Sequence, residues 1–197
     1  GGGPAGTVSA LECSKMGLNV LLMERGKRGR HKPCGGIVPP ICADIISETL
    51  ETSIPREVMC SPETLGLYYI PPSGRKNGGS IKNYKLININ RNLFDQWLCE
   101  LVEESGVHVW YNTEFFELQQ LESIQVLAKR SRKTVKLTTR YLIGADGIHS
   151  RVRKQLYREK KVETLPILQE YWKAKGEFDD YFYAVYGEAI SPTYAYV

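Results

Sequence analysis

Residues 1–24 read GGGPAGTVSALECSKMGLNVLLME, and the first six letters of this stretch predict how the chain folds. Gly1, Gly3 and Gly6 follow the pattern G-x-G-x-x-G. In that pattern the glycines allow a tight turn, a close approach of backbone to a pyrophosphate, and close packing of the following helix. Pro4 suits the first turn of that helix, where its missing N–H would have no intrahelical partner anyway. The stretch therefore predicts a glycine turn followed by a helix.

A short apolar run, LNVLLME, occupies residues 18–24 and ends in an acid. Gly17 can cap the preceding helix, and a nearly continuous apolar run is typical of a strand buried on both faces of a parallel sheet. Glu24 stands where an acid can accept hydrogen bonds from a ribose 2′-hydroxyl and disfavour a 2′-phosphate. Turn, helix and strand thus indicate part of a dinucleotide-binding βαβ unit, with an ordinary glycine turn before a surface helix as the alternative.

The rest of the chain predicts a mixed α/β fold. An apolar stripe indicates an amphipathic helix at 91–106, and alternating residues at 114–139 favour antiparallel strands joined by the basic turn KRSRK. The run YLIGADG at 141–147 predicts a buried strand that lies in the same parallel sheet as 18–24 and ends in a glycine turn. The other expected elements are a loop at 25–40, a short helix near 41–50, strands near 65–71, 80–89 and 107–112, a short helix at 149–157, and tyrosine-rich strands within 167–197.

The expected architecture is a Rossmann-like parallel sheet that lacks its first strand. A phosphate-binding glycine turn needs a strand to launch it, and no strand precedes Gly1 in this sequence. We assign residues 1–157 to a nucleotide-binding domain with an insertion at 41–90 and the antiparallel strands at 114–139. Residues 158–197 are expected to begin a β-rich substrate domain, and the chain is expected to be a fragment of a larger protein.

Composition narrows the function classes. The chain is 42% hydrophobic and 24% charged with a net charge of +4, which favours a packed core and gives little support to nucleic-acid binding. Its five cysteines show no CxxC pair and no zinc spacing with histidine, so we expect no metal site and a reduced, cytoplasmic setting. No apolar run reaches the roughly 18–20 residues that span a bilayer. The basic run is expected to be a solvated loop, with an anionic substrate head or a membrane surface as the alternative; it comprises Lys27, Arg28, Arg30, His31 and Lys32.

Two further stretches carry candidate chemistry. HKPCGGIVPP, at residues 31–40, places Cys34 between a proline and the glycines Gly35 and Gly36, which let backbone approach a ligand closely. Cys34 is therefore either a reactive thiol beside a ligand or a small hydrophobe that fills a gap. In GADG, at 144–147, Asp146 could accept hydrogen bonds from ligand hydroxyls at the carboxyl edge of a sheet, with a plain β-turn aspartate as the alternative.

These motifs together resemble a known family. GGGPAG, Glu24, KPCGG, RNLFDQWL and GADGIHSRVRK stand in the order found in FAD-dependent oxidoreductases of the geranylgeranyl reductase group, within the aromatic-hydroxylase-like flavoproteins. The resemblance covers most of residues 1–157, and KPCGG is its most specific piece. The sequence departs from the family because it lacks the family's later Gly-Asp motif. The end YAYV matches only the start of the family's Tyr-x-Trp-x-Phe-Pro element, with Tyr196 in place of Trp.

The resemblance implies a set of FAD-binding residues and no metal ligands. Cys34 is the one residue that we expect to take part in catalysis. The implied cofactor contacts are Gly1, Gly3, Pro4, Ala5 and Gly6 at the pyrophosphate, Glu24 at the adenosine ribose with Arg25 beside it, Arg91 at the ribose–phosphate region, Cys34, Gly35 and Gly36 at the isoalloxazine ring, and Asp146 and Gly147 at the pyrophosphate or ribityl chain.

The function that the resemblance implies is reduction of isoprenoid C=C bonds in prenyl lipids or chlorophyll-type side chains. Reduced FAD would deliver a hydride and Cys34 would supply the proton. The expected electron source is NADPH or reduced ferredoxin, so the partners would be a prenyl substrate, an electron-donor protein and, as an alternative to a purely cytoplasmic enzyme, a membrane surface. Two other functions stay open: a flavin monooxygenase or halogenase on the same scaffold, and a relative of electron-transfer flavoprotein dehydrogenases.

Overall fold

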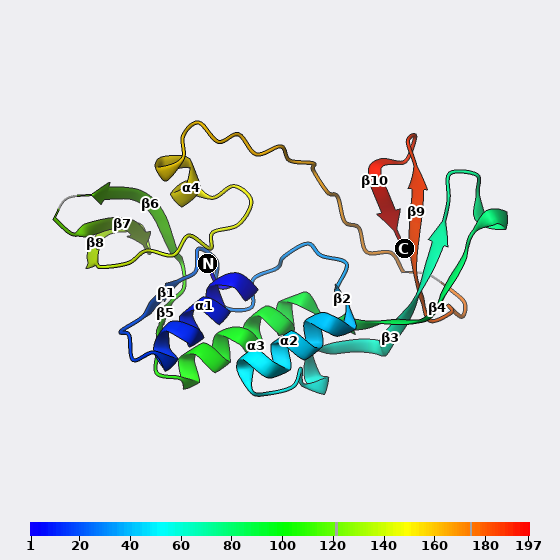
Figure 1. The fold of residues 1–197 in the computed structure, drawn as a ribbon, viewed down its shortest axis with the longest axis horizontal. Helices are drawn as coiled ribbons and strands as arrows, with labels where there is room; N and C mark the ends of the chain where they lie inside the picture. The colour runs from blue at the N-terminus through cyan, green and yellow to red at the C-terminus, as the bar shows by residue number, and fades with distance from the viewer. Residues whose placement is uncertain (121, 174) are drawn as a thin grey trace. The chain divides into compact units, whose positions relative to one another are not determined.

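The computed structural model describes residues 1–197 except Leu121 and Ala174. Two compact units make up the chain: Gly1–His31 with Phe94–Ile167, and Lys32–Leu93 with Leu168–Val197 (Figure 1). No helix in this described part is long and apolar enough to cross a membrane. The domain ranges 1–157 and 158–197 stay a prediction. Positions 121 and 174 fall within the ranges 114–139 and 167–197, where strands are expected, and these two positions lie outside the described residues.

In the first unit, helix α1 (Pro4–Lys15) begins directly after the glycine turn, with its proline at the start. The helix ends at Gly17, whose φ of 75° lies in the left-handed region that favours glycine. The N–H of Leu18 then donates to the carbonyl of Cys13 at 3.1 Å, which closes a Schellman motif. The sequence prediction of this helix and of its glycine end is confirmed.

The parallel pairing of this unit joins β1 (Leu21–Met23) to β5 (His108–Trp110), with Leu22 opposite Val109. Helix α3 (Arg91–Glu104) precedes β5 and buries one face that includes Leu98 and Val102. The amphipathic helix predicted at 91–106 is thus present, although Leu93 within it is 42% exposed.

The prediction of a buried strand at 141–145 that shares a sheet with 18–24 is wrong. The structure assigns no strand to these residues, and Tyr141 and Ile143 are exposed. An apolar run becomes a buried strand only when another strand satisfies its backbone groups. Among the described residues, β1 pairs with β5 and not with residues 141–145. Leu142 of this run packs against the core cluster of the unit.

The antiparallel strands predicted within 114–139 are confirmed. They form a three-stranded sheet in the order β6-β7-β8, and the turn between β7 and β8 has positive φ at both Ser131 and Arg132, as the tight hairpin turn of type I′ requires. Phe115, Val126 and Val152 form the core beneath this sheet. The elements are β6 (Thr113–Gln120), β7 (Ile124–Arg130), β8 (Lys133–Thr139) and the short helix α4 (Arg151–Leu156), which carries Val152.

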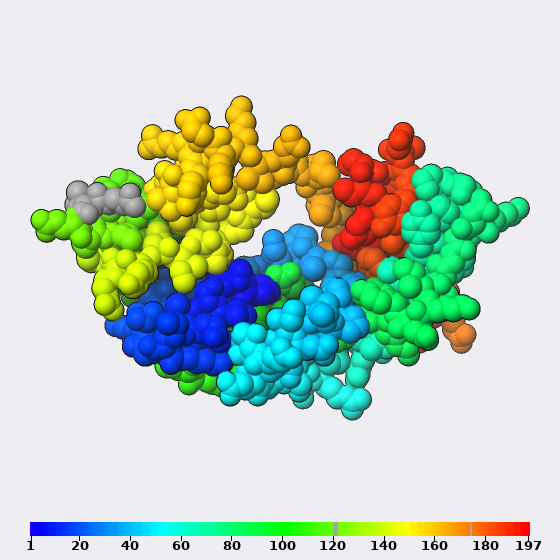
Figure 2. Space-filling model, viewed as in Figure 1, coloured from blue at the N-terminus to red at the C-terminus, as the bar shows by residue number. Residues whose placement is uncertain are grey.

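The second unit is a five-stranded mixed sheet in the order β10-β9-β3-β4-β2. Its long hairpin β3–β4 is antiparallel, and β9 joins the outer edge of β3 in parallel, so that side chains of the C-terminal hairpin lie against those of β3 (Figure 2). The loop expected at 25–40 contains the short strand β2, because Ile37 and Val38 pair with the end of β4. The elements are β2 (Ile37–Val38), α2 (Pro40–Leu50), β3 (Met59–Ile70), β4 (Gly79–Ile89), β9 (Tyr181–Gly187), β10 (Ser191–Tyr196) and 3₁₀ turns at Arg56–Val58 and Arg75–Asn77.

Aromatic rings cover both faces of this sheet. Strand alternation places Tyr181 and Tyr183 on the face of Tyr68, with ring centroids 5.9 and 5.1 Å from the Tyr68 ring. On the opposite face the rings of Phe182 and Tyr196 stack with centroids 5.4 Å apart. The tyrosine-rich tail therefore packs as sheet.

Candidate functional site

The glycine turn in the first unit is too tight for side chains. A Cβ added to Gly6 would overlap the carbonyl oxygen of Gly1, well under the 3.0 Å that real Cβ contacts keep. A Cβ on Gly1 would lie 2.7 Å from the carbonyl oxygen of Ala145. Gly3 is the N-cap of α1 and offers no side chain to cap it, and the first turn carries no acidic residue. Bare backbone at a helix N-terminus is suited to an anion such as a pyrophosphate.

Glu24 lies at the carboxyl end of β1, where backbone hydrogen bonds to Trp110 and Thr113 extend the pairing of β1 with β5 and the residues that follow it. Its carboxylate is buried and faces the glycine turn. Oε2 accepts the N–H of Gly2 at 2.6 Å, and Oε1 accepts the N–H of Gly26 at 2.6 Å. These two bonds fix the carboxylate between the turn and the loop that follows β1.

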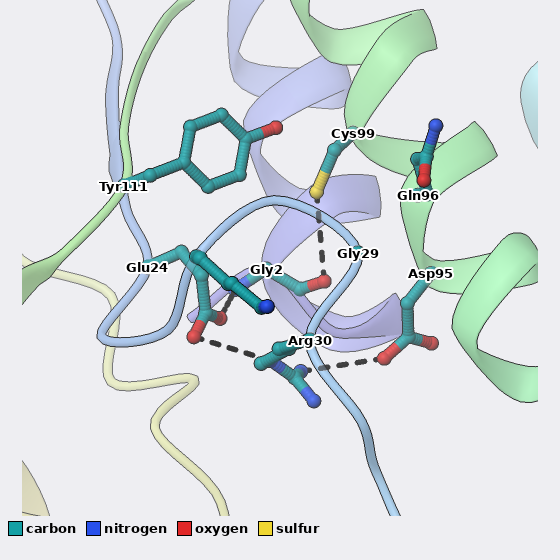
Figure 3. A pocket seen from close by; sticks show the side chains of 9 residues that line it. Gly2, Glu24, Gly29, Arg30, Asp95, Gln96, Cys99 and Tyr111 are labelled. Carbon is teal, nitrogen blue, oxygen red and sulfur yellow. Dashed lines mark hydrogen bonds and ion pairs between the residues drawn. The ribbon is translucent and has the colours of Figure 1, made fainter.

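Arg30 closes this site from the loop. Its Nε lies 3.1 Å from Oε1 of Glu24, and its Nη2 lies 3.3 Å from Oδ2 of Asp95 on α3 (Figure 3). The side chains of Glu24 and Asp95 are 8% and 6% exposed, and that of Arg30 is 23% exposed. One guanidinium therefore links two buried carboxylates from different elements of the unit.

A small cavity of about 10 Å³, close to the volume that one water requires, lies inside this arrangement. Cys99 and Tyr111 help to line it, and the thiol of Cys99 points at the carbonyl of Gly2, 3.6 Å from it (Figure 3). Burial raises the pKa of the Cys99 thiol and of the Tyr111 hydroxyl, so both groups stay neutral at pH 7. Glu24 is thus the charged acid that faces the turn.

The electrostatics keep Glu24 ionised. Burial raises the pKa of Glu24, but the hydrogen bonds from Gly26 and Gly2 and the charge of Arg30 together outweigh it and hold that pKa below its usual value. A carboxylate has about four lone-pair positions, and the three donors leave room for one more. A ribose hydroxyl is a donor of the kind that could take that position.

Asp146 has a structural task in this fold. Its Oδ2 accepts the backbone N–H groups of Arg151 at 2.7 Å and of Val152 at 3.3 Å, so it caps the start of α4 together with Ser150. Burial raises the pKa of Asp146, whereas the Ser150 hydroxyl and these N–H groups lower it, and the net direction is down. Gly147, with φ of 84°, forms the turn between Asp146 and the helix.

Two of the basic residues near the site, Arg28 and Arg30, pair with acids. Arg28 contacts Glu103 at 2.6 Å and Glu100 at 3.4 Å. Arg25, by contrast, is 79% exposed and lies 4.0 Å from Glu114, too far to be a strong pair. The solvated loop expected from the sequence therefore contains Arg30, which links two buried carboxylates, and Arg28, which pairs with acids at the surface.

Cys34 lies in the second unit on the turn that leads to β2. Gly36 has φ of 72°, and a Cβ there would overlap the carbonyl of Ile89, so the chain can pass the end of β4 only with glycine. The Nη1 of Arg91 donates to the sulfur of Cys34 at 3.7 Å. Since sulfur is the acceptor, the thiol hydrogen stays available to another partner.

An apolar wall adjoins this turn. A Cβ added to Gly35 would meet the rings of Tyr196 and Phe182 at 3.5 and 3.6 Å, which is ordinary van der Waals contact. The two stacked rings thus flank the backbone beside Cys34. The resemblance implies Cys34 and Gly35 at the isoalloxazine ring and Arg91 at the ribose–phosphate region of the cofactor; within this unit Arg91 contacts the sulfur of Cys34, and the cofactor roles stay predictions.

The residues of the first unit fit the pyrophosphate and ribose of a dinucleotide. The glycine turn leaves backbone where a Cβ would intrude, the N-terminus of α1 is uncapped, and Glu24 keeps one acceptor position. Sequence reasoning missed Arg30 and Asp95 as part of this site. Asp95 carried a usable signal, because an acid on the apolar stripe of a helix needs a cation when it is buried.

Comparison with known proteins agrees with this geometry. A family model described as "FAD binding domain" matches residues 1–177. Protein CbrA of Escherichia coli O139:H28 is 26% identical over 98% of this chain and 54% of its own length. The geranylgeranyl diphosphate reductase of Rhodobacter capsulatus is 32% identical over 79% of this chain and 38% of its own length. A geranylgeranyl bacteriochlorophyll reductase-like protein of Thermoplasma acidophilum has the same fold, with a TM-score of 0.76 and 20% identity over all of this chain and 51% of that structure.

The chain spans about half the length or less of the curated relatives it matches.

Proposed function

This chain belongs to the FAD-binding-domain family, and on that basis we propose that it serves a flavoenzyme that saturates isoprenoid C=C bonds in prenyl lipids or chlorophyll-type side chains. The likeness to the geranylgeranyl diphosphate reductase carries the proposal. The turn that carries Cys34 supports the proposal, because a thiol beside the paired rings of Phe182 and Tyr196 suits the apolar chain of a prenyl substrate better than a polar substrate.

When bound, FAD would supply the hydride, since such redox chemistry belongs to the cofactor. The protein would hold its pyrophosphate at the glycine turn of residues 1–6 and its ribose at Glu24. An isolated alkene accepts hydride poorly, so a positioned proton donor matters. We assign that role to the thiol of Cys34. The two new C–H bonds would then take one hydride and one proton, and the π bond would be consumed.

The proposal is tested by isolating the protein with its flavin and measuring alkene saturation without oxygen. NADPH and reduced ferredoxin are supplied in separate reactions, and a geranylgeranyl alcohol or diphosphate is the substrate. We expect products heavier by two hydrogens per double bond in mass spectra. A protein that consumes oxygen and yields hydroxylated or halogenated product, with no saturation from either donor, would instead support a monooxygenase or halogenase.

Glu24→Ala should weaken FAD binding by about 1.5–3 kcal/mol, because the ribose loses a hydrogen bond to a charged acceptor. The same change leaves the N–H groups of Gly2 and Gly26 without their acceptor, so the melting temperature should fall as well. The FAD dissociation constant is measured by quenching of flavin fluorescence, at a temperature where the variant is folded.

Glu12→Ala is the matched control for this change. Glu12 lies on α1 and is half exposed in a pair with Lys15, so its loss should alter neither FAD affinity nor stability by more than about 0.5 kcal/mol. A lower melting temperature for Glu24→Ala with an unchanged FAD dissociation constant would show that Glu24 only holds the loop.

Cys34→Ala should slow alkene saturation about 100-fold while FAD binding and flavin reduction stay normal, because a general acid typically contributes that much or more. Cys34→Ser keeps a donor but makes it a far weaker acid, so it should be impaired as well, and Ala at least as strongly. Flavin reduction is followed by absorbance and alkene saturation by product analysis, in separate experiments on each variant.

Cys42→Ala gives the control, since Cys42 is another partly buried thiol of the second unit, on α2. Its turnover should match that of the unaltered protein. If Cys34→Ala saturates the alkene at the normal rate, the thiol merely packs in the turn and the proton comes from another group.

A further inference from the structure

The backbone of Cys34 is held by a residue 135 positions away in the sequence. Oε1 of Gln169 accepts the N–H of Cys34 at 2.9 Å, and Nε2 of Gln169 donates to the carbonyl of the same residue at 2.8 Å. One carboxamide thus closes a ring of two hydrogen bonds on a single peptide residue. Two bonds of opposite direction fix both the position and the orientation of that residue better than one bond can.

Other anchors flank Cys34 but do not hold it directly. The N–H of Lys32 donates to the side chain of Asn92 at 3.2 Å, and the carbonyl of Gly36 accepts the N–H of Ile89 at 2.8 Å. Between these two points the turn makes no strand pairing. Gln169 therefore supplies the contacts that decide where the middle of the turn lies.

The burial pattern singles out Gln169 in its own segment. All other side chains of residues 156–173 are exposed, including Leu168 at 83%, Tyr171 at 78% and Trp172 at 82%. Ordering a glutamine side chain costs about 1.5–2 kcal/mol of rotamer freedom, so a single ordered glutamine needs specific partners to offset that cost. Those partners are the two backbone groups of Cys34.

We infer that Gln169 is a positioning residue, which holds the peptide of Cys34 so that the thiol keeps one place in the site. Arg91 contacts the sulfur directly, and Gln169 fixes the backbone from which the side chain projects. The inference rests on the proposed role of Cys34 for its effect on turnover. Its structural half, the hold on the Cys34 peptide, can be measured without any prenyl substrate.

The chain contains a matched control. Gln155 on α4 uses the same chemistry in the first unit: Oε1 accepts the N–H of Leu118 at 2.8 Å, and Nε2 donates to the carbonyl of Phe116 at 2.7 Å. Gln155→Ala therefore removes an equivalent pair of bonds from a partly buried glutamine elsewhere. It should leave the amide of Cys34 unaffected.

The first readout is hydrogen exchange at the Cys34 amide, resolved from overlapping peptides by mass spectrometry of the flavin-loaded protein. Gln169→Ala should speed this exchange about tenfold, as expected when two neutral hydrogen bonds are lost from one opening. Gln169→Glu distinguishes a specific hold on the Cys34 peptide from a general loosening of the turn. Its ionised carboxylate sets an oxygen against the Cys34 carbonyl, whereas the protonated acid again offers one donor and one acceptor. Protection should therefore be lost at pH 8 and recovered in part at pH 5, compared with the unaltered protein at each pH.

The second readout is turnover at saturating substrate, where Gln169→Ala should slow alkene saturation about tenfold or more with little change in the rate of flavin reduction. Unchanged exchange in Gln169→Ala overturns the inference, as does equal exchange in the Ala and Glu variants at both pH values. Altered exchange with normal saturation in an active protein also overturns it. If the unaltered protein reduces no prenyl compound, the proposed function fails, while the exchange data still decide whether Gln169 holds Cys34.

Discussion

Gly6→Ala is expected to remove bound flavin and to lower the melting temperature sharply. The added methyl would overlap the backbone carbonyl of Gly1, and a backbone atom cannot turn aside as a flexible side chain can. The glycine turn would have to open, which costs about 1–3 kcal/mol or more in a tightly packed site and displaces the N-terminus of α1 from the pyrophosphate. Flavin content by absorbance and thermal unfolding by circular dichroism measure the two effects.

Gly79→Ala is the control for the same added methyl group. Gly79 begins β4, has no positive φ, and has no atom within 4 Å of the added Cβ position. Flavin content and melting temperature should stay close to those of the unaltered protein. A yellow, equally stable Gly6→Ala protein would mean that the turn relaxes freely and that the close approach has no importance for the cofactor.

Arg30→Met should lower the free energy of unfolding by about 3 kcal/mol at pH 7. The change keeps the aliphatic bulk of the side chain but removes the cation that contacts the buried carboxylates of Glu24 and Asp95. Removing one partner of a buried ion pair typically costs about 3–5 kcal/mol, and the lower end applies because part of Arg30 reaches solvent. Urea unfolding followed by circular dichroism measures the difference.

The pH dependence identifies the carboxylates as the cause. Because the pKa of Glu24 is depressed in the folded protein, its ionisation contributes stability that is present above its unfolded value of about 4.3 and is lost as pH falls through the folded value. Arg30→Met raises that folded pKa, so the gap between the two proteins should be widest near pH 7 and narrow below about pH 4.5. A gap that does not change with pH would point to lost packing.

Arg28→Met tests whether the loss of any arginine of the loop destabilises the protein as much as the loss of Arg30. Arg28 also contacts two acids, Glu100 and Glu103, but its side chain is 48% exposed. Exposed pairs contribute about 0–1 kcal/mol, so this variant should unfold almost like the unaltered protein. Equal losses for the Arg28 and Arg30 variants would contradict the view that burial of Glu24 and Asp95 decides the effect.

Local signals in the sequence predicted those parts of the site that depend on neighbouring residues. The glycine turn, α1 with its end at Gly17, the place of Glu24 after a buried strand, and the helix at Arg91 all follow from spacing over a few residues. Each of these predictions required only that the chain obey turn and helix chemistry nearby. The contact of Arg91 with the sulfur of Cys34 joins residues 57 positions apart and did not follow from such local signals.

Long-range contacts could not be predicted in the same way. Nothing in a basic loop says that Arg30 will link Glu24 to Asp95, because the partner lies 65 residues away on a helix. The hold of Gln169 on Cys34 spans 135 residues and leaves no periodic pattern. The failed strand at 141–145 shows the same limit, since an apolar run states a preference for burial but not whether a neighbouring strand is there to pair with it.

The parallel pairing of β3 with β9 has a consequence for the order in which the chain folds during synthesis. The β3–β4 hairpin can form early, but its outer edge meets residues 181–185 only after a further stretch of more than ninety residues beyond β4 has left the ribosome. In that interval the open edge of β3, with Tyr68 and Tyr69 on it, is a template for any other extended chain. The first unit, whose last segment ends at Ile167, can finish earlier. While the chain is being synthesised, the unpaired edge of β3 should therefore be prone to aggregation. Chaperones that shield unpaired strands would act at this stage.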